Sequence, residues 1–152
     1  MNTRLSRFVI GLFLLSASSC NQAAASQFDD FNHKITFVDQ QRTVYVAIAA
    51  DNDSRERGLM FRRELTEDQG MLFVYPDQSR RGVWMKNTLL ALDVLFLSGD
   101  GKIVAMLKDL QPCRHEPCRI YDSKIPARYM LELSSGFIDK HLLKVGQQIT
   151  LP

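Results

Sequence analysis

Apolar and polar residues alternate along two early segments of the chain, the pattern of β-strands with one buried face. Ile35 and Phe37 alternate with polar neighbours and predict a first strand. Residues 43–50 (TVYVAIAA) predict a second strand, in which every other residue from Val44 onward shares a face. The polar turn at residues 39–41 lies between them, so the two strands are expected to form a hairpin.

Further short apolar segments, bounded by turn residues, predict more strands. The sequence Ser98-Gly99-Asp100-Gly101 lies between two apolar runs and predicts a second hairpin. The remaining strands are predicted at residues 70–75, 83–86, 92–97, 103–107, 128–133 and 148–151. This order indicates an α+β, mainly β, fold: a small curved sheet or barrel-like single domain with two short helices.

The two helices are predicted from their capping residues. Asp53 is expected to cap the first helix, with Glu56 reaching back three residues later. Ser134 or Ser135 is expected to cap the second helix, which would run through Leu143.

The first residues have the pattern of an export signal rather than of a membrane span. Arg4 and Arg7 precede the apolar run 8–15 (FVIGLFLL), which is much shorter than the roughly 20 residues that cross a bilayer. Small residues before Cys20 favour a lipoprotein signal, with Cys20 lipidated as the first mature residue. The alternative is cleavage by ordinary signal peptidase after Ala25.

Three segments follow from this reading. Residues 1–20 are a lipoprotein-type signal, residues 21–32 a polar tether, and residues 33–152 a single β-rich domain. We expect a periplasmic protein anchored to a membrane through its lipid, or a soluble periplasmic protein if cleavage follows Ala25.

The cysteines indicate a disulfide, and the net charge restricts the class of binding partner. Cys113 and Cys118 lie in a proline-containing loop over residues 109–126, and in an oxidising compartment such a pair predicts a disulfide. The chain has 19 basic and 17 acidic residues, a formal net charge of +2. This balance argues against a general polyanion binder, so no nucleic-acid partner is expected.

Four short motifs follow one another along the chain. They are Arg57-Gly58-Leu59-Met60-Phe61-Arg62, then Gly70-Met71-Leu72-Phe73, then Trp84-Met85-Lys86-Asn87-Thr88 with Leu92-Asp93, and finally Ala127-Arg128-Tyr129 with Leu131-Glu132-Leu133. Together they resemble the bacterial and archaeal family catalogued as domain of unknown function 192, from about residue 35 to residue 151. Ala91 departs from the family, which often has proline there. The resemblance implies a compact β-rich domain, often exported, and carries no established activity.

Asp93 is the most informative polar residue because it interrupts the apolar run 89–97. A carboxylate buried without partners costs several kcal/mol, so Asp93 must be paired, hydrogen-bonded or at a rim. The local donors are Lys86, Asn87 and Thr88. We expect Asp93 to tie down the loop before its own strand; the functional alternative is a pocket floor or a general base.

Trp84 and Lys86 share a face if their segment is a strand, where they could stack a sugar ring or cover a flat ligand. The favoured interpretation is that Trp84 is a core residue.

Glu132 is expected to be a solvated surface residue. In the alternative, Asp93 and Glu132 are the two carboxylates of a hydrolase acting on an envelope polysaccharide.

Other chemistry-bearing residues have simpler interpretations. Met60, Met71, Met85, Met106 and Met130 could bind a soft metal such as copper, but core packing is favoured, and no cofactor is expected.

These residues lead to one functional hypothesis with two alternatives. The candidate ligand-binding residues are Arg57, which could bind an anionic group, together with Trp84, Lys86, Asn87, Asp93 and Glu132. No catalytic residue is assigned. The favoured function is an exported small envelope domain, a non-enzymatic binding or accessory module for an unknown ligand or envelope partner. The hydrolase and the copper-binding protein are the alternatives.

Overall fold

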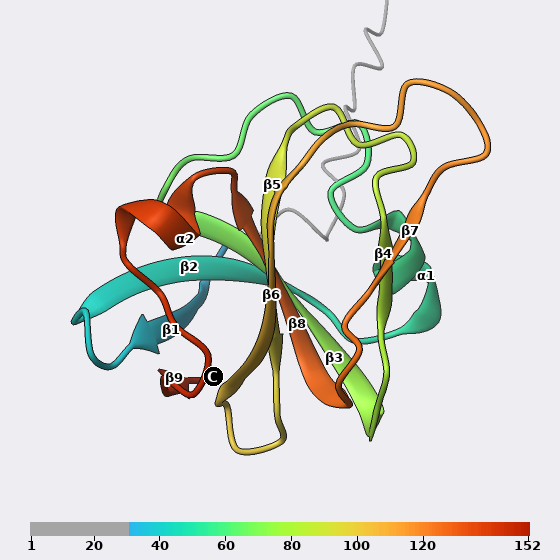
Figure 1. The fold of residues 1–152 in the computed structure, drawn as a ribbon. Helices are drawn as coiled ribbons and strands as arrows, with labels where there is room; N and C mark the ends of the chain where they lie inside the picture. Colours follow the sequence, from blue (N-terminus) through green and yellow to red (C-terminus); the bar gives the residue numbers. More distant parts are fainter. Residues whose placement is uncertain (1–30) are drawn as a thin grey trace, which may run out of the picture.

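A computed structural model describes residues 31–152 (Figure 1). In this part of the chain, seven strands form one curled, half-barrel sheet with the order β6-β5-β8-β3-β2-β1-β9, and β4 and β7 form a separate two-stranded ribbon. The elements are β1 (His33–Phe37), β2 (Arg42–Ala49), α1 (Asn52–Arg57), β3 (Gln69–Ser79), β4 (Gly82–Trp84), β5 (Leu92–Leu97), β6 (Ile103–Leu110), β7 (Ile120–Asp122), β8 (Ala127–Ser134), α2 (Phe137–Lys140) and β9 (Ile149–Thr150). The predicted class, a mainly β single domain with two short helices, is confirmed.

Both predicted hairpins are present. β1 pairs antiparallel with β2, and β5 pairs antiparallel with β6 across the turn at residues 98–101. β3 runs parallel to β2 and continues past its predicted end at Tyr75 to Ser79. The strand tolerates Pro76 because the pairing with β8 shifts register between Val74 and Ser79, an irregularity where no regular ladder bond is required of the proline.

The helix caps differ from the prediction. Asp51, not Asp53, caps α1: the Ser54 N–H donates to the Asp51 carboxylate at 2.8 Å, and the Asp51 N–H donates to the Ser54 hydroxyl at 3.2 Å. This reciprocal pair is a capping box built with serine in the third position. Gly58 ends the helix.

The second helix is also shorter than predicted. Gly136 is the N-cap of α2, because Ser134 is still the last residue of β8, where it pairs with Leu92 of β5. The helix ends at Lys140, before Leu143.

The sheet separates two apolar clusters. Because successive residues of a strand point to opposite faces, Leu131 and Leu133 of β8 join the first cluster, under α2, whereas Met130 joins the second. The second cluster also contains Leu59 and Val83, which come from the region of α1 and from the β4–β7 ribbon. In Figure 1 that ribbon and α1 lie together on one side of the main sheet, and α2 lies on the other.

The loop over residues 109–126 contains the predicted Cys113–Cys118 disulfide. It also contains β7, which the sequence did not indicate. β7 pairs with β4 so that Ile120 lies opposite Trp84.

The predicted signal segment, most of the tether, Cys20 and Ala25 lie outside the described residues. Within residues 31–152, neither helix has the length and apolar character needed to cross a bilayer.

Candidate functional site

Glu132 lies in the middle of β8 with its side chain in the second apolar cluster. Its cross-strand neighbours are Met71 of β3 and Val94 of β5, both buried in that cluster. Only 5% of Glu132 is exposed. The expectation of a solvated surface glutamate was therefore wrong, because the face of β8 that carries Met130 and Glu132 is covered rather than open to solvent.

The carboxyl group of Glu132 has no protein partner among residues 31–152: neither a hydrogen bond nor an ion pair reaches it. Burial raises its pKa to about 8. Loss of water penalises the charged form, and no cation offsets that penalty. At neutral pH the group is therefore an uncharged carboxylic acid, which can donate one hydrogen bond and accept others.

A cavity of about 60 Å³ lies above this carboxyl group. Its lining residues are Arg55, Glu56, Arg57, Gly58, Leu59, Met60, Phe73, Tyr75, Gly82, Val83, Trp84, Thr88, Met130 and Glu132. Gly58 keeps the space open: a Cβ there would lie 3.2 Å from Cζ of Phe73 and 3.9 Å from Oε2 of Glu132. Its φ of +47° also favours glycine.

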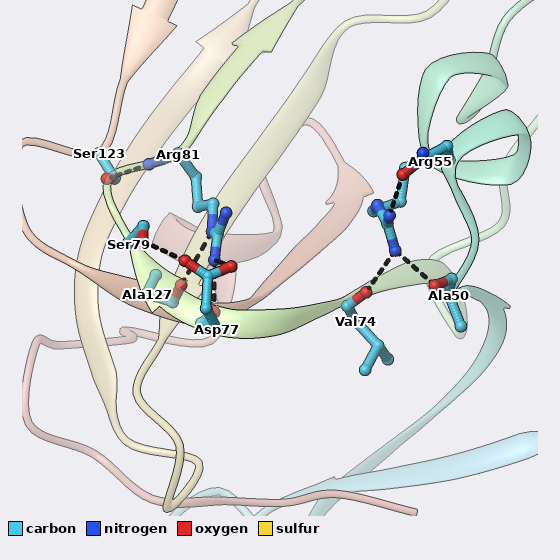
Figure 2. Close-up of polar contacts among 9 residues, drawn as sticks. Ala50, Arg55, Val74, Asp77, Ser79, Arg81, Ser123 and Ala127 are labelled. Atoms are coloured by element: carbon cyan, nitrogen blue, oxygen red, sulfur yellow. Dashed lines mark hydrogen bonds and ion pairs between the residues drawn. The ribbon is translucent and has the colours of Figure 1, made fainter.

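Two arginines at the edge of this region are held by backbone carbonyls (Figure 2). Arg55 donates to the carbonyl oxygens of Ala50 and Val74, the latter at 2.9 Å. Arg81 donates through Nε to the Ala127 carbonyl at 3.0 Å. Both guanidinium groups are thereby fixed in place as structural donors.

The same arginines enclose Tyr75, a wall of the cavity. The Arg55 and Arg81 guanidinium carbons lie 5.3 Å and 4.0 Å from the centre of its ring. Burial raises the pKa of the Tyr75 hydroxyl, and the neighbouring Glu132 raises it further. Tyr75 is therefore a neutral hydroxyl donor beside the uncharged carboxyl group.

A wider basin of about 510 Å³ adjoins the cavity. Its lining residues are Asp53, Glu56, Arg57, Met60, Phe61, Trp84, Lys86 and Asn87, four of which also line the cavity. Trp84 is 37% exposed, so the favoured core placement was wrong. It lies on the outer face of the short β4–β7 ribbon, where Lys86 places its Nζ 5.4 Å from the ring centre.

Two residues at the rim of the basin have strained backbone conformations. Phe61 and Asn87 have φ values of 61° and 53°, which are uncommon for residues other than glycine. The Phe61 N–H donates to the Asn87 carbonyl at 2.8 Å, and the Asn87 amide contacts the Met60 sulfur at 3.8 Å. These contacts hold Phe61 outward with 67% of its surface exposed. Residues kept in such conformations cluster at binding and active sites.

Asp93 lies on the opposite face of the sheet from Glu132, since it pairs with Leu133 of the first cluster. Its carboxylate accepts hydrogen bonds from the backbone N–H groups of Asp109 and Ile138, each at 2.8 Å. The predicted local donors were wrong, because these backbone groups satisfy it. Asp93 and Glu132 share no cleft, so the geometry required of the hydrolase pair is not met.

The five singled-out methionines do not converge. Met60 and Met130 line the cavity, Met71 and Met85 are buried in the second cluster, and Met106 packs against the first cluster. Within residues 31–152, no group of three or more His, Cys, Asp or Glu side chains is arranged to hold a metal ion. Core packing accounts for the three methionines outside the cavity.

Four predicted site residues, Arg57, Trp84, Lys86 and Asn87, do surround the basin, and Glu132 closes the cavity beside it. Lys86 also forms an ion pair with Glu116 at 3.5 Å. Gly58, Phe61 and Tyr75 also line the site, and reasoning from the sequence missed them. The motif at residues 57–62 held the only available signal for the first two, whereas Tyr75 ended an ordinary apolar strand.

Three comparisons place the chain among known proteins. The model of the family "Uncharacterized ACR", domain of unknown function 192, matches residues 34–151. A crystal structure from Sinorhizobium meliloti 1021, provisionally described as a transcription regulator, is 35% identical, with a TM-score of 0.70 over 78% of this chain and 91% of that one. A protein of unknown function from Novosphingobium aromaticivorans DSM 12444 is 23% identical, with a TM-score of 0.70 over 78% of this chain and 82% of that one, a likeness of fold alone. No curated protein matches the chain.

Proposed function

We propose that this chain, which belongs to the family of domain of unknown function 192, is a non-enzymatic binding module of the cell envelope. The observation that carries this proposal is Glu132. Its carboxyl group has no hydrogen-bond partner within residues 31–152 and borders the cavity. Nearly all buried polar groups in native proteins have a partner. A ligand that enters the cavity would supply the missing partner.

The surroundings of Glu132 support a ligand site rather than an accident of packing. Gly58 leaves space above the carboxyl group, and the strained pair Phe61 and Asn87 shapes the rim. The basin is within the size range of small-molecule sites, about 300–1,000 Å³. It combines the exposed aromatic rings of Phe61 and Trp84 with charged and polar side chains.

Binding is favoured over hydrolysis because the two carboxyl groups have different surroundings. Asp93 accepts two backbone hydrogen bonds on the opposite face of the sheet, whereas Glu132 lines the cavity, so these two groups cannot act on one bond. Acid–base hydrolysis of a glycoside uses two carboxyl groups on the two sides of one bond. A net charge of +2 gives little attraction to a phosphate backbone, which argues against the DNA binding that the regulator description of the Sinorhizobium meliloti protein suggests.

The envelope location rests on the sequence at the N-terminus. Arg4, Arg7 and the apolar run 8–15 form an export signal, and Cys20 follows as the proposed lipidated residue. The Cys113–Cys118 disulfide supports an oxidising compartment. Cleavage after Ala25 would leave the same module free in the periplasm.

A fragment screen tests the binding function directly. Trp84 is the only tryptophan of the chain and lines both the basin and the cavity, so its fluorescence reports on this site. The probes are small polyols, amines, carboxylates and aromatic fragments at millimolar concentration, followed by fluorescence and by backbone amide NMR. We expect at least one class to shift both the Trp84 emission and the amide signals of β8. If no class of fragment does so, neither the cavity nor the basin is a binding site, and the proposal fails.

A further inference from the structure

Two of the polar groups that border the inner cavity are uncharged, although Arg55, Glu56 and Arg57 also line it. Glu132 contributes a carboxylic acid and Tyr75 a phenol; both line the cavity, and an ionised Glu132 raises the pKa of the Tyr75 hydroxyl, so the two groups are near each other. No hydrogen bond within residues 31–152 uses either hydroxyl group. Each therefore offers one donor and at least one acceptor to an occupant.

The charged side chains that line the cavity carry both signs, Glu56 negative and Arg55 and Arg57 positive, so a charged arm of either sign meets a like charge. An anionic group would approach the Glu56 carboxylate and would also oppose any ionisation of Glu132. A cationic group would face Arg55, whose guanidinium lines the same cavity and is fixed by the Ala50 and Val74 carbonyls. Like charges at close range in a partly desolvated site repel strongly. An uncharged hydroxyl group avoids both penalties and matches the two neutral partners.

The basin outside supplies a different chemistry. Trp84 and Phe61 expose aromatic surface, and Asp53, Glu56 and Asn87 surround it with oxygen and nitrogen atoms. The face of an aromatic ring is electron-rich and attracts weakly positive C–H bonds. A pyranose ring presents such C–H bonds on one face and hydroxyl groups at its edge, so it matches both features of the basin.

We propose that the ligand is a neutral saccharide whose ring packs on Trp84 in the basin while a hydroxyl-bearing arm enters the cavity between Glu132 and Tyr75. The dimensions agree. A cavity of about 60 Å³ exceeds what one water molecule needs and suits a hydroxymethyl group, and the basin is large enough for the ring. This inference rests on the proposed binding function and names its ligand class.

Three probes with one ring test it. Methyl glucopyranoside carries a hydroxymethyl arm, methyl glucuronide a carboxylate arm, and the corresponding 6-amino-6-deoxy glucoside an ammonium arm. Trp84 fluorescence and amide NMR measure the affinity of each. We expect the neutral glycoside to bind at least about tenfold more tightly than either charged one, a difference of about 1.4 kcal/mol.

The outcomes separate this inference from the proposed function. If a charged probe binds at the basin and cavity as tightly as the neutral one, the inference of an uncharged arm is wrong and the binding function stands. If no glycoside binds but other fragments do, the saccharide is wrong and the binding function again stands. If no probe or fragment binds at the basin or cavity, both the saccharide inference and the binding function are wrong.

Variants locate the two contacts. Trp84→Ala should weaken binding of the neutral glycoside several-fold, whereas Tyr45→Ala, an exposed aromatic on β2 outside the site, should not. Glu132→Gln keeps an uncharged donor and acceptor and should retain binding, whereas Glu132→Leu should lose it. Loss of binding in Glu132→Gln would show that an ionised carboxylate is required and would overturn the inference.

Discussion

Asp93 of β5 and Glu132 of β8 are buried carboxyl groups on neighbouring strands, and their roles are opposite. Asp93 pairs with Leu133, the residue after Glu132. Asp93 is 1% exposed and accepts two backbone hydrogen bonds, so its burial is compensated within the fold. Glu132 is nearly as buried and has no such compensation. The difference comes from the faces on which they lie: Asp93 faces free N–H groups near α2, and Glu132 faces methionine, aromatic and glycine residues around a cavity.

The raised pKa of Glu132 predicts a pH-dependent stability. Between pH about 4.5 and about 8 the unfolded chain loses the Glu132 proton while the native protein retains it. The free energy of unfolding therefore falls as pH rises through this window, by at most about 1.4 kcal/mol per pH unit. Glu132→Gln removes this penalty, so the variant should gain stability relative to wild type as pH rises.

Urea denaturation at several pH values measures this effect. Glu64→Gln, a change at an exposed glutamate, is the control and should follow the wild type. Parallel curves for wild type and Glu132→Gln across the window would contradict the prediction.

Gly58 offers a second test at the residue scale. In Gly58→Ala the new methyl group meets Phe73 at 3.2 Å, and the backbone must hold a φ of +47°. We expect a loss of about 1–3 kcal/mol in stability together with a shift in Trp84 emission as the cavity changes. Gly146→Ala, at another positive φ with open space around it, should cost stability and leave the emission unchanged. An unshifted emission in Gly58→Ala would show that Gly58 does not shape the site.

At the scale of elements, Asp93 joins three of them. It belongs to β5, and its carboxylate binds the N–H of Asp109 near the end of β6 and the N–H of Ile138 in the first turn of α2. A carboxylate is favoured there because the first N–H groups of a helix lack partners and carry partial positive charge. This single side chain therefore docks the short helix α2 against the sheet.

Asp93→Ala leaves both N–H groups without a partner, and we expect the protein to lose about 1–3 kcal/mol of stability. Asp93→Asn retains one acceptor oxygen and should lose less. Denaturant melts, with amide exchange of Ile138, measure both effects. An unchanged midpoint and unchanged exchange in Asp93→Ala would show that other contacts hold α2.

The sequence predicted elements better than it predicted their ends. Alternation and turn residues located both hairpins, since these signals are local. The caps of the helices were displaced because Asp51 and Ser54 satisfy each other, a pairing that competes with Asp53. β7 was missed since its only partner is β4, far away in the chain, and three residues carry too little pattern to reveal it.

At the scale of the whole molecule, the site is assembled from distant segments. Arg57 is the last residue of α1 and Phe61 follows that helix, whereas Trp84 belongs to β4 and Glu132 to β8. Residue types alone identified Trp84, Lys86 and Asn87 as candidates, but no local signal could show that Glu132 is buried. Its burial depends on the β4–β7 ribbon and α1 covering one face of the sheet, which is a consequence of the fold.

The proposed anchor is a prediction about the whole chain. Cells expressing the wild type should incorporate labelled palmitate into the protein, and Cys20→Ala should abolish that label, because two acyl chains require this cysteine. An inhibitor of lipoprotein signal peptidase should leave the precursor uncleaved. An unlabelled wild type whose N-terminus begins at Ser26 would refute lipidation and retain export.

The most direct test of the site is the titration of the Glu132 carboxyl group itself. Carbon-13 NMR of protein labelled at glutamate side-chain carboxyl carbons follows this group, and Glu132→Gln assigns its signal by deletion. We predict a midpoint near pH 8, as expected for a carboxyl group held uncharged and without a partner in its cavity. A midpoint near the ordinary value of 4.5 would mean that water or a cation already stabilises the Glu132 carboxylate. That result would contradict the claim that Glu132 is an uncharged group available to hydrogen-bond a ligand.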